Sequence, residues 1–360
     1  MTMWLGKCRT GIVAVTILGL LAVGACLPKP TSESGGGVNI TVYGFSIMKE
    51  SLEKAIYPSF AAKMKREHGF DVHFTSSFAG SETVTNQILQ GVKAQIAILS
   101  IERDAQRLKD RGLVTSDWRA LPQKGIVNKT PFVILVRKGN PKGIHDFPDL
   151  AKPGIRLIHP DPISSGGAQW SILAIYGSEL VKTEKQQPSE SVGLGNMTVS
   201  EIGRARALQM LQAIWRNVIS TPSSAREART QFELGNGDAL VTYELDGLLM
   251  KLGNAKGDAE IVIPEATILS EHPAVVVDRN VSASDRPVID AFMQYLWSDE
   301  AQRAFVRFHF RSSTNDALNQ ENNELATITY AFTVEDRFGG WDKAYPEVIE
   351  GVFRDLVQKR

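Results

Sequence analysis

Residues 160–170 read Pro160-Asp161-Pro162-Ile163-Ser164-Ser165-Gly166-Gly167-Ala168-Gln169-Trp170, between an apolar segment at 155–158 and a helical pattern at 168–176 that Gly177 is expected to end. The two prolines end the strand, because proline cannot continue its hydrogen-bond ladder. The serines favour a helix cap, and the glycines leave the first helical N–H groups uncovered. Free N–H groups at the positive end of a helix dipole form an anion site. An ordinary capped helix with nothing bound explains the same residues, and no lysine stands at the spacing of a nucleotide-binding loop.

The chain has no net charge, so it does not attract a charged partner through its overall electrostatic field. Forty Lys and Arg residues match forty Asp and Glu residues, so no net charge attracts nucleic acid or an anionic membrane. A preference for anions would therefore have to come from local geometry. At 360 residues the chain is long enough for two domains, each with its own core.

The first 26 residues have the pattern of an export signal. Lys7 and Arg9 precede an apolar run at 12–23, and small residues lead to Cys26. The run is shorter than the roughly 20 residues that a membrane-spanning helix needs. Residues 23–26, Val-Gly-Ala-Cys, resemble the bacterial lipobox, which implies that Cys26 becomes the lipidated N-terminus of the mature protein. An ordinary signal peptide with a chance cysteine is the alternative.

Export bears on both cysteines and on the location of the protein. Cys8 would leave with the signal peptide and Cys26 would carry lipid, so a disulfide and thiol chemistry are excluded. Residues 27–37 are rich in Pro, Ser and Gly and predict a flexible tether. The protein is therefore expected in the periplasm or at the cell surface, as a lipoprotein anchored in the membrane.

The segment after the tether alternates strands with helices. We expect strands at 38–43, 70–74 and 96–99, and helices at 47–64 and from 81 to about 90. This βαβαβ order predicts a parallel sheet with right-handed crossovers. Ser/Gly loops follow the first two strands, at the sheet edge where open α/β folds bind ligands.

The middle third of the chain is expected to form a second lobe. Apolar strands at 132–136 and 274–277 flank it, and the aromatic residues of 290–310 are assigned to core packing. Between the flanking strands, helices are expected at 199–218 and 224–234, and strands at 239–243 and 261–263. The pattern predicts an α/β fold in which one lobe (38–130 and 275–360) is interrupted by the other (131–274), joined by two hinge strands.

Residue patterns of enzymes, metal sites and nucleotide sites do not occur. The six histidines never fall four apart, and neither Cys-x-x-Cys nor Gly-x-Ser-x-Gly is found. Residues 235–238, Gly-Asn-Gly-Asp, lack the third glycine of a dinucleotide fingerprint and predict a turn. The sequence predicts a binding protein without cofactor or metal, and disfavours a sulfate- or phosphate-ester hydrolase, which would need a nucleophile–base pair or metal set.

Four segments carry a resemblance to a known family. They are residues 135–144 (Leu-Val-Arg-Lys-Gly-Asn-Pro-Lys-Gly-Ile), 152–154 (Lys-Pro-Gly), 165–168 (Ser-Gly-Gly-Ala) and 338–341 (Phe-Gly-Gly-Trp). In this order they resemble the sulfate-binding proteins of bacterial ABC importers, over residues 38–345. The resemblance implies the two-lobed periplasmic-binding-protein type II fold, which closes on its ligand like a hinge. It also implies capture of sulfate, or a related oxyanion such as thiosulfate, and delivery to a membrane permease.

The resemblance also assigns binding residues. The Ser-Gly-Gly turn at 165–167 would supply a hydroxyl and two amides, and Ser77 would lie in the loop of Ser81. Gly44 and Ala225 would donate backbone N–H groups, and Tyr243 stands where the family has tryptophan. The complete set is Gly44, Ser77, Ser81, Ser165, Gly166, Gly167, Ala225 and Tyr243.

Glu82 departs from the family, which has glycine there. A carboxylate about 4 Å from an anionic charge would cost on the order of 4 kcal/mol at an effective dielectric of 20. We expect Glu82 to point into solvent. The alternatives are that it pairs with a cation such as Arg229, or that the ligand carries a proton, as hydrogen phosphate does. A phosphate- or sulfonate-binding protein and an oxyanion sensor therefore stay open, and the protein is expected to be a monomer that binds no nucleic acid.

Overall fold

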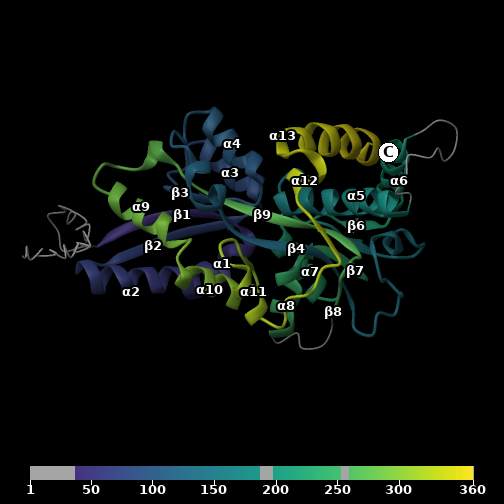
Figure 1. The fold of residues 1–360 in the computed structure, drawn as a ribbon, viewed down its shortest axis with the longest axis horizontal. Helices are drawn as coiled ribbons and strands as arrows, with labels where there is room; N and C mark the ends of the chain where they lie inside the picture. Colours follow the sequence, from purple (N-terminus) through teal and green to yellow (C-terminus); the bar gives the residue numbers. More distant parts are fainter. Residues whose placement is uncertain (1–36, 187–197, 253–258, 360) are drawn as a thin grey trace, which may run out of the picture.

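The computed structural model describes residues 37–186, 198–252 and 259–359 (Figure 1). The expected signal peptide, the expected anchor residue Cys26 and nearly all of the predicted tether lie outside these residues. Among the helices that the structure describes, none is both long and apolar enough to cross a membrane.

The strands join in one mixed sheet. The order along the sheet is β2-β1-β3-β9-β4-β7-β5-β6, with β8 and β10 added to β4 and β11 added to β9. The strands are β1 (Val38–Phe45), β2 (Val72–Ala79), β3 (Ile96–Ile98), β4 (Ile126–Arg137), β5 (Leu157–Ile158), β6 (Val218–Ser220), β7 (Ala239–Tyr243), β8 (Ala259–Val262), β9 (Ala266–Val276), β10 (Arg311–Ser312) and β11 (Tyr330–Phe332).

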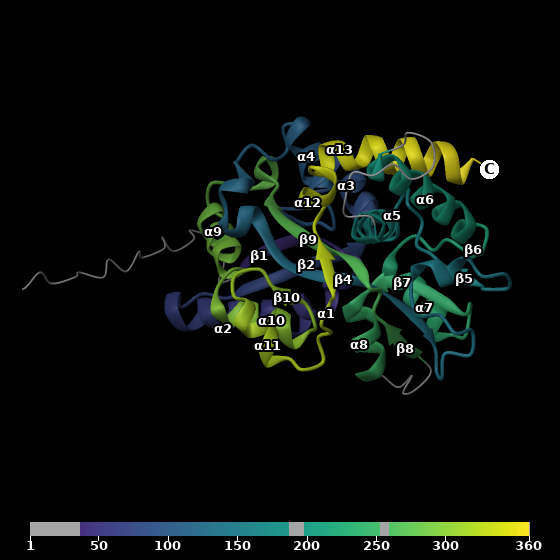
Figure 2. The same ribbon diagram turned by 45° about the vertical axis from the view of Figure 1, so that its right-hand side comes forward.

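Helices cover both faces of this sheet (Figures 1 and 2). The described helices are α1 (Lys49–Ser51), α2 (Tyr57–His68), α3 (Ser81–Leu89), α4 (Glu102–Asp110), α5 (Gly166–Gln186), α6 (Val199–Trp215), α7 (Ala225–Glu233), α8 (Glu244–Leu252), α9 (Arg286–Tyr295), α10 (Asp299–Arg307), α11 (Asp316–Glu321), α12 (Val334–Phe338) and α13 (Trp341–Ala344). A 3₁₀ turn (Ser46–Met48) precedes α1, and π-helical segments occupy Leu52–Ile56 and Tyr345–Gln358.

The sheet divides into two lobes linked by β4 and β9. Parallel strands β1–β3 form the sheet of lobe 1, and parallel strands β5–β7 form that of lobe 2. Strand β4 pairs with β9 as far as Pro131 and with β7 from Phe132 onward, while the far end of β9 pairs with β3. The predicted two-lobed α/β fold with two hinge strands is therefore confirmed. The residue boundaries of the lobes stay a prediction.

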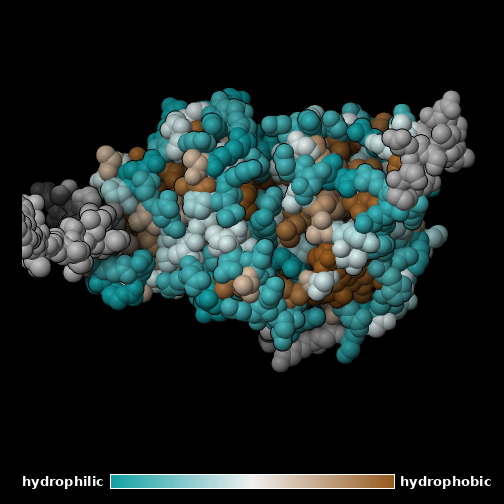
Figure 3. All heavy atoms as spheres, viewed as in Figure 1, coloured by the Kyte–Doolittle hydropathy of each residue, from teal (hydrophilic) through white to brown (hydrophobic). Residues whose placement is uncertain are grey.

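The C-terminal segment lies over lobe 2, beside α5 and α6 (Figure 2). The rings of Trp215 and Phe353 meet edge to face with centroids 4.6 Å apart, and Gln212 donates to the carbonyl of Leu356. The stretch predicted for lobe 1 thus contains a segment that contacts lobe 2. The molecular surface is mainly hydrophilic in the view of Figure 3, as expected when the apolar residues pack inside.

Helix α5 continues well beyond Gly177, where the sequence predicted its end. A Cβ atom at Gly177 would lie 2.6 Å from the ring of Phe332 and 3.1 Å from that of Phe338. The glycine therefore allows close packing of a long buried helix and does not cap it. Similarly, β1 extends to Phe45 and β2 to Ala79, so both strands are longer than predicted.

Two histidines are buried as neutral imidazoles. His272, on hinge strand β9, contacts Asn128 Oδ1 at 2.7 Å, and His159 contacts Ser171 Oγ at 2.5 Å. Burial lowers the pKa of His272 to about 3 and that of His159 to about 4.

The buried His272 predicts loss of stability in acid. An unfolded histidine titrates near pH 6.5, so the unfolded state binds more protons between that pH and the lowered pKa, and stability falls as pH falls through this window. At pH 5 the loss from His272 is about 2 kcal/mol. We expect His272→Gln to reduce the difference between the unfolding free energies at pH 7 and 5 by about this amount, measured by urea denaturation.

The exposed His145 offers a matched control. His145→Gln should leave the pH difference at its wild-type value. Equal pH differences in wild type and His272→Gln would contradict the assignment of a neutral buried imidazole.

Candidate functional site

The N-termini of α3, α5 and α7 meet between the lobes. Gly80, which precedes α3 of lobe 1, lies so close to lobe 2 that a Cβ atom would be 2.2 Å from the carbonyl oxygen of Ser164 and 2.7 Å from that of Ser223. These two residues lie in the loops that lead into α5 and α7. The amide of Thr83 also lies 3.4 Å from the Ser164 oxygen. Three positive helix ends thus converge from two lobes.

The first turn of α5 has free donors. Gly166 and Gly167 hold the first two helical positions, where an N–H group has no acceptor within the helix. Ser165 is 2% exposed, yet its hydroxyl forms no hydrogen bond with any residue that the structure describes. A hydroxyl of a buried residue and two adjacent amides therefore lie together without partners among the described residues. That they bind an anion stays a prediction.

Residues of lobe 1 and β7 face this turn. A Cβ atom on Gly166 would lie 2.8 Å from Ser100 Oγ and 3.2 Å from Ser81 Cβ, and one on Gly167 would lie 2.9 Å from the Tyr243 hydroxyl. The hydroxyls of Ser100 and Tyr243 are 2.9 Å apart. Burial raises the pKa of Tyr243, so its phenol is neutral and able to donate or to accept. The structure therefore brings Ser81, the Ser-Gly-Gly turn and Tyr243 together; their role in binding stays a prediction.

Ala225 lies at the start of α7, capped by Ser224, whose hydroxyl accepts from the amide of Glu227. The neighbouring Arg226 joins the lobes: it forms an ion pair with Glu50 and donates to the Ser46 carbonyl at 3.2 Å. Although burial alone would raise the pKa of Glu50, the Arg226 guanidinium holds it below its ordinary value. The contact places α7 against the first helical turn after β1.

Gly44 and Ser77 lie in strands and not in the loops that the sequence predicted, and their role in binding stays a prediction. Both are inside strands: Gly44 pairs with Phe78 and Ile98, and Ser77 pairs with Tyr43. A Cβ atom on Gly44 would lie 2.8 Å from the Phe78 ring, so ring packing accounts for this glycine. Ser46, in the 3₁₀ turn that follows β1, contacts lobe 2 through its carbonyl, which accepts from Arg226 Nε at 3.2 Å.

Comparison with known proteins agrees with this geometry. Residues 40–311 match the family model described as bacterial extracellular solute-binding protein. The sulfate-binding protein of Synechococcus elongatus is 31% identical over 99% of this chain and 98% of its own. The thiosulfate-binding protein of Escherichia coli is 32% identical over 85% of this chain and 86% of its own. The solved sulfate-binding protein of Mycobacterium tuberculosis has a TM-score of 0.74 at 26% identity and covers 86% of this chain and 99% of its own.

The chain belongs to the bacterial extracellular solute-binding proteins. It is therefore a binding protein and not an enzyme. Small-molecule sites are preferentially found between domains, so the place where the three helix N-termini meet is the candidate ligand site.

Glu82 of this solute-binding protein is buried, and the expectation that it points into solvent is wrong. Its carboxylate forms ion pairs with Arg103 and Arg107 on α4 and accepts from Gln169 Nε2 at 3.1 Å. The partner suggested from the sequence, Arg229, instead pairs with Asp246 at 3.0 Å. Two guanidinium groups balance the carboxylate, so the charge of Glu82 is compensated beside the candidate site.

Two residues of the site were missed in the sequence. Ser100 follows β3, and its backbone N–H donates to Ser81 Oγ at 2.9 Å while its carbonyl accepts from Trp170 Nε1 at 2.7 Å. Asp104 lies one turn further on, fully buried, with Oδ2 2.6 Å from Ser81 Oγ. The signal for Ser100 was present: like the predicted Ser/Gly loops, it follows a strand of the parallel sheet.

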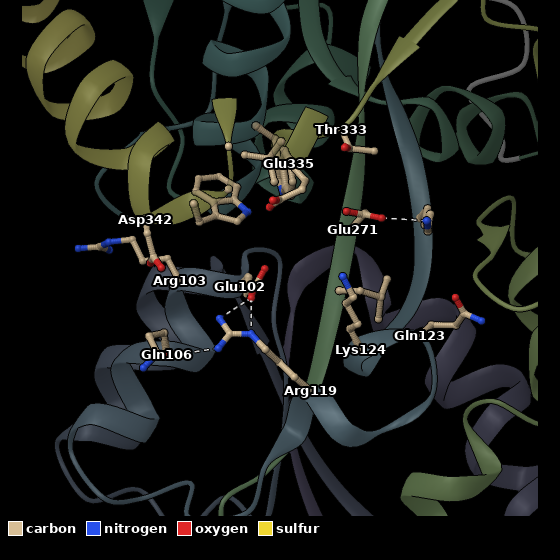
Figure 4. Close-up of a pocket in the computed structure, with 17 residues that line it drawn as sticks. Glu102, Arg103, Gln106, Arg119, Gln123, Lys124, Glu271, Thr333, Glu335 and Asp342 are labelled. Atoms are coloured by element: carbon tan, nitrogen blue, oxygen red, sulfur yellow. Dashed lines mark hydrogen bonds and ion pairs between the residues drawn. The ribbon is translucent and has the colours of Figure 1, made fainter. Parts of the chain in front are cut away.

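A cavity of about 740 Å³ lies beside the site, between α4, the hinge strands and the segment around α12 and α13 (Figure 4). Its charged lining is largely paired, as in the contacts of Arg119 with Glu102 and of Lys129 with Glu271. The indole of Trp170 separates this cavity from Ser100. Among the described residues, no cluster of acidic, His or Cys side chains could hold a metal ion.

The ion pairs of Glu82 predict a measurable contribution to stability. Glu82→Gln removes the negative charge that Arg103 and Arg107 share and leaves Arg103 without this ion pair, while Arg107 keeps Asp104 at 3.3 Å. Since both guanidinium groups are partly exposed, we expect the free energy of unfolding to fall by about 2 kcal/mol, less than for a fully buried pair. Urea denaturation at neutral pH measures the change.

Glu53 is the control, because it forms an exposed ion pair with Lys49. Glu53→Gln should change stability by less than about 1 kcal/mol. If both variants lost the same small amount, Glu82 would behave as a surface residue.

Proposed function

We propose that this protein captures sulfate, or a related tetrahedral oxyanion such as thiosulfate, between its lobes and delivers it to an ABC importer. The observation that carries the proposal is the hydroxyl of the buried residue Ser165, which has no partner among the described residues and lies next to the two free amides that open α5. Hydrogen bonds from such donors to a charged oxygen contribute about 1.5–3 kcal/mol each. The relatives named as sulfate- and thiosulfate-binding proteins support sulfate or thiosulfate as the ligand.

The site would hold its guest mainly with neutral donors. The arginines near it are already engaged: Arg103 and Arg107 with Glu82, and Arg226 with Glu50. Backbone N–H groups, hydroxyls and helix dipoles remain for the anion. The expected residues are the Ser-Gly-Gly turn, Ser81, Tyr243, Ser77 and the amides of Gly44 and Ala225, with Ser46 and Ser100 added.

The location and partners form part of the same proposal. The protein would act outside the cytoplasm as a monomer, attached to the membrane through lipid on Cys26, and its closed form would dock on the permease. The sequence of residues 7–26 supports the anchor. Because the charge of Glu82 is balanced by arginines, its position no longer favours phosphate over sulfate.

Calorimetric titration with sulfate, thiosulfate, molybdate, phosphate and an alkyl sulfonate tests the proposal. We expect heat with sulfate or thiosulfate. Ser165→Ala should weaken binding at least severalfold, since it removes one charge-assisted hydrogen bond. Gly166→Asp should abolish binding, because even a Cβ atom there would lie 2.8 Å from Ser100 Oγ.

Ser164→Ala is the control, because the Ser164 hydroxyl donates to the Ser223 carbonyl at 2.8 Å and is not free for a guest. This variant should bind nearly as wild type. The proposal would be overturned by the absence of heat with every oxyanion, or by preferential binding of the sulfonate or phosphate.

A further inference from the structure

Ser81 has one hydroxyl hydrogen, and two groups of lobe 1 already use the oxygen. The backbone N–H of Ser100 donates to Ser81 Oγ at 2.9 Å, and Asp104 Oδ2 lies 2.6 Å away. A hydroxyl offers one donor and two acceptor positions. A single position on the hydroxyl therefore remains for a guest. Ser81 lies against the first turn of α5, since a Cβ atom on Gly166 would be 3.2 Å from Ser81 Cβ.

The protonation of Asp104 decides what that last position offers. If Asp104 is a carboxylate, it takes the hydrogen of Ser81, and Ser81 presents a lone pair to the guest. If Asp104 carries a proton, it donates to Ser81 Oγ, and the hydrogen of Ser81 is free for the guest. Sulfate has acceptors alone, so a lone pair facing it would be repulsive and a free hydrogen would bind it.

We propose that Asp104 is a positioning residue that takes up one proton when a fully ionised oxyanion such as sulfate binds, so that Ser81 donates to the guest. The inference rests on the proposed function, and it adds that binding of the oxyanion is coupled to the uptake of one proton. The step is balanced: the proton comes from solvent, it resides on Asp104 Oδ2, and no bond of the guest is broken. A guest that carries its own proton, such as hydrogen phosphate, would donate to Ser81 and leave Asp104 ionised.

The surroundings of Asp104 allow this proton to bind near neutral pH. Complete burial and the nearby carboxylate of Glu82 on α3 raise the pKa of Asp104 to about 7, against the opposing effects of Ser81, Arg107 and Arg103. The Nη1 atom of Arg107 lies 3.3 Å from Asp104 Oδ1 but also pairs with Glu82.

The groups on neighbouring elements complete this environment. From lobe 2, α5 contributes the uncharged Gln169, which donates to Glu82. From the C-terminal segment, the ring of Tyr345 stacks on the guanidinium of Arg103, with its centroid 3.4 Å from Arg103 Cζ.

Strand β9 adds no unbalanced charge. Its Glu271 is paired with Lys129 at 2.8 Å, and its His272 is held neutral by burial. The charges that act on Asp104 are thus the carboxylate of Glu82 and the guanidinium groups of Arg103 and Arg107. Both guanidinium groups also form ion pairs with Glu82.

The test is the pH dependence of sulfate affinity, since sulfate itself does not titrate between pH 6 and 8.5. In the wild type we expect the dissociation constant to rise about thirtyfold over this range, following the ionisation of Asp104. Calorimetry at pH 8.5 in two buffers of different ionisation enthalpy should show uptake of about one proton per sulfate.

Two variants separate this effect from a structural role. In Asp104→Asn the amide donates to Ser81 at every pH, so the affinity at pH 8.5 should approach the wild-type value at pH 6, without proton uptake. Asp110→Asn, on the exposed end of the same helix, should keep the wild-type pH profile.

The outcomes distinguish this inference from the proposed function. A flat wild-type profile without proton uptake, or an Asp104→Asn protein that keeps the wild-type slope, would overturn the role of Asp104 and leave sulfate binding intact. If Asp104→Asn does not fold, calorimetry of the wild-type protein in the two buffers still shows whether a proton is taken up with sulfate. Failure of every oxyanion to bind at pH 6 would overturn the proposed function itself.

Discussion

The meeting of three helix N-termini is the constraint on which the rest of this structure depends. Each carries a partial positive charge of roughly half an elementary charge, and those of α3, α5 and α7 come from opposite lobes. Such ends repel one another unless negative charge lies near them. The approach at Gly80 is nevertheless so close that no larger residue would fit against the carbonyls of Ser164 and Ser223.

The carboxylates near these helix ends lie on the sides of the helices and do not occupy the space where the three N-termini meet. Asp104 contacts Ser81 from inside lobe 1, Glu82 is enclosed by Arg103 and Arg107, and Glu50 is paired with Arg226. Each of these carboxylates is therefore either paired with an arginine or hydrogen-bonded to a hydroxyl group. The faces of Gly166 and Gly167 stay free of acidic side chains, so an anion would meet amides and hydroxyls there.

Local chemistry explains which parts of the site the sequence could predict. Proline, serine and glycine act on their own backbone, so the loop after β5 was predicted and the start of α5 was placed to within two residues. The ion pairs of Glu82 were not predicted, because its partners lie 21 and 25 residues away on another helix. Gly177 was misinterpreted for a similar reason, since the rings that pack on it come from the C-terminal segment. The error at Gly44 concerns the end of a strand, which depends on its neighbours in the sheet.

The contacts between the lobes connect closure to the charge of the guest. Trp170 reaches the carbonyl of Ser100, Gln169 reaches Glu82, and Arg226 reaches Glu50, so each bond crosses the interface beside the candidate site. They lie at the same interface as the helix ends, and they offset the repulsion between those ends. An anion enclosed there would remove the repulsion at its source, whereas a neutral solute of the same size would not. Selection for charge would then arise from the geometry of closure, without any positive side chain in contact with the guest.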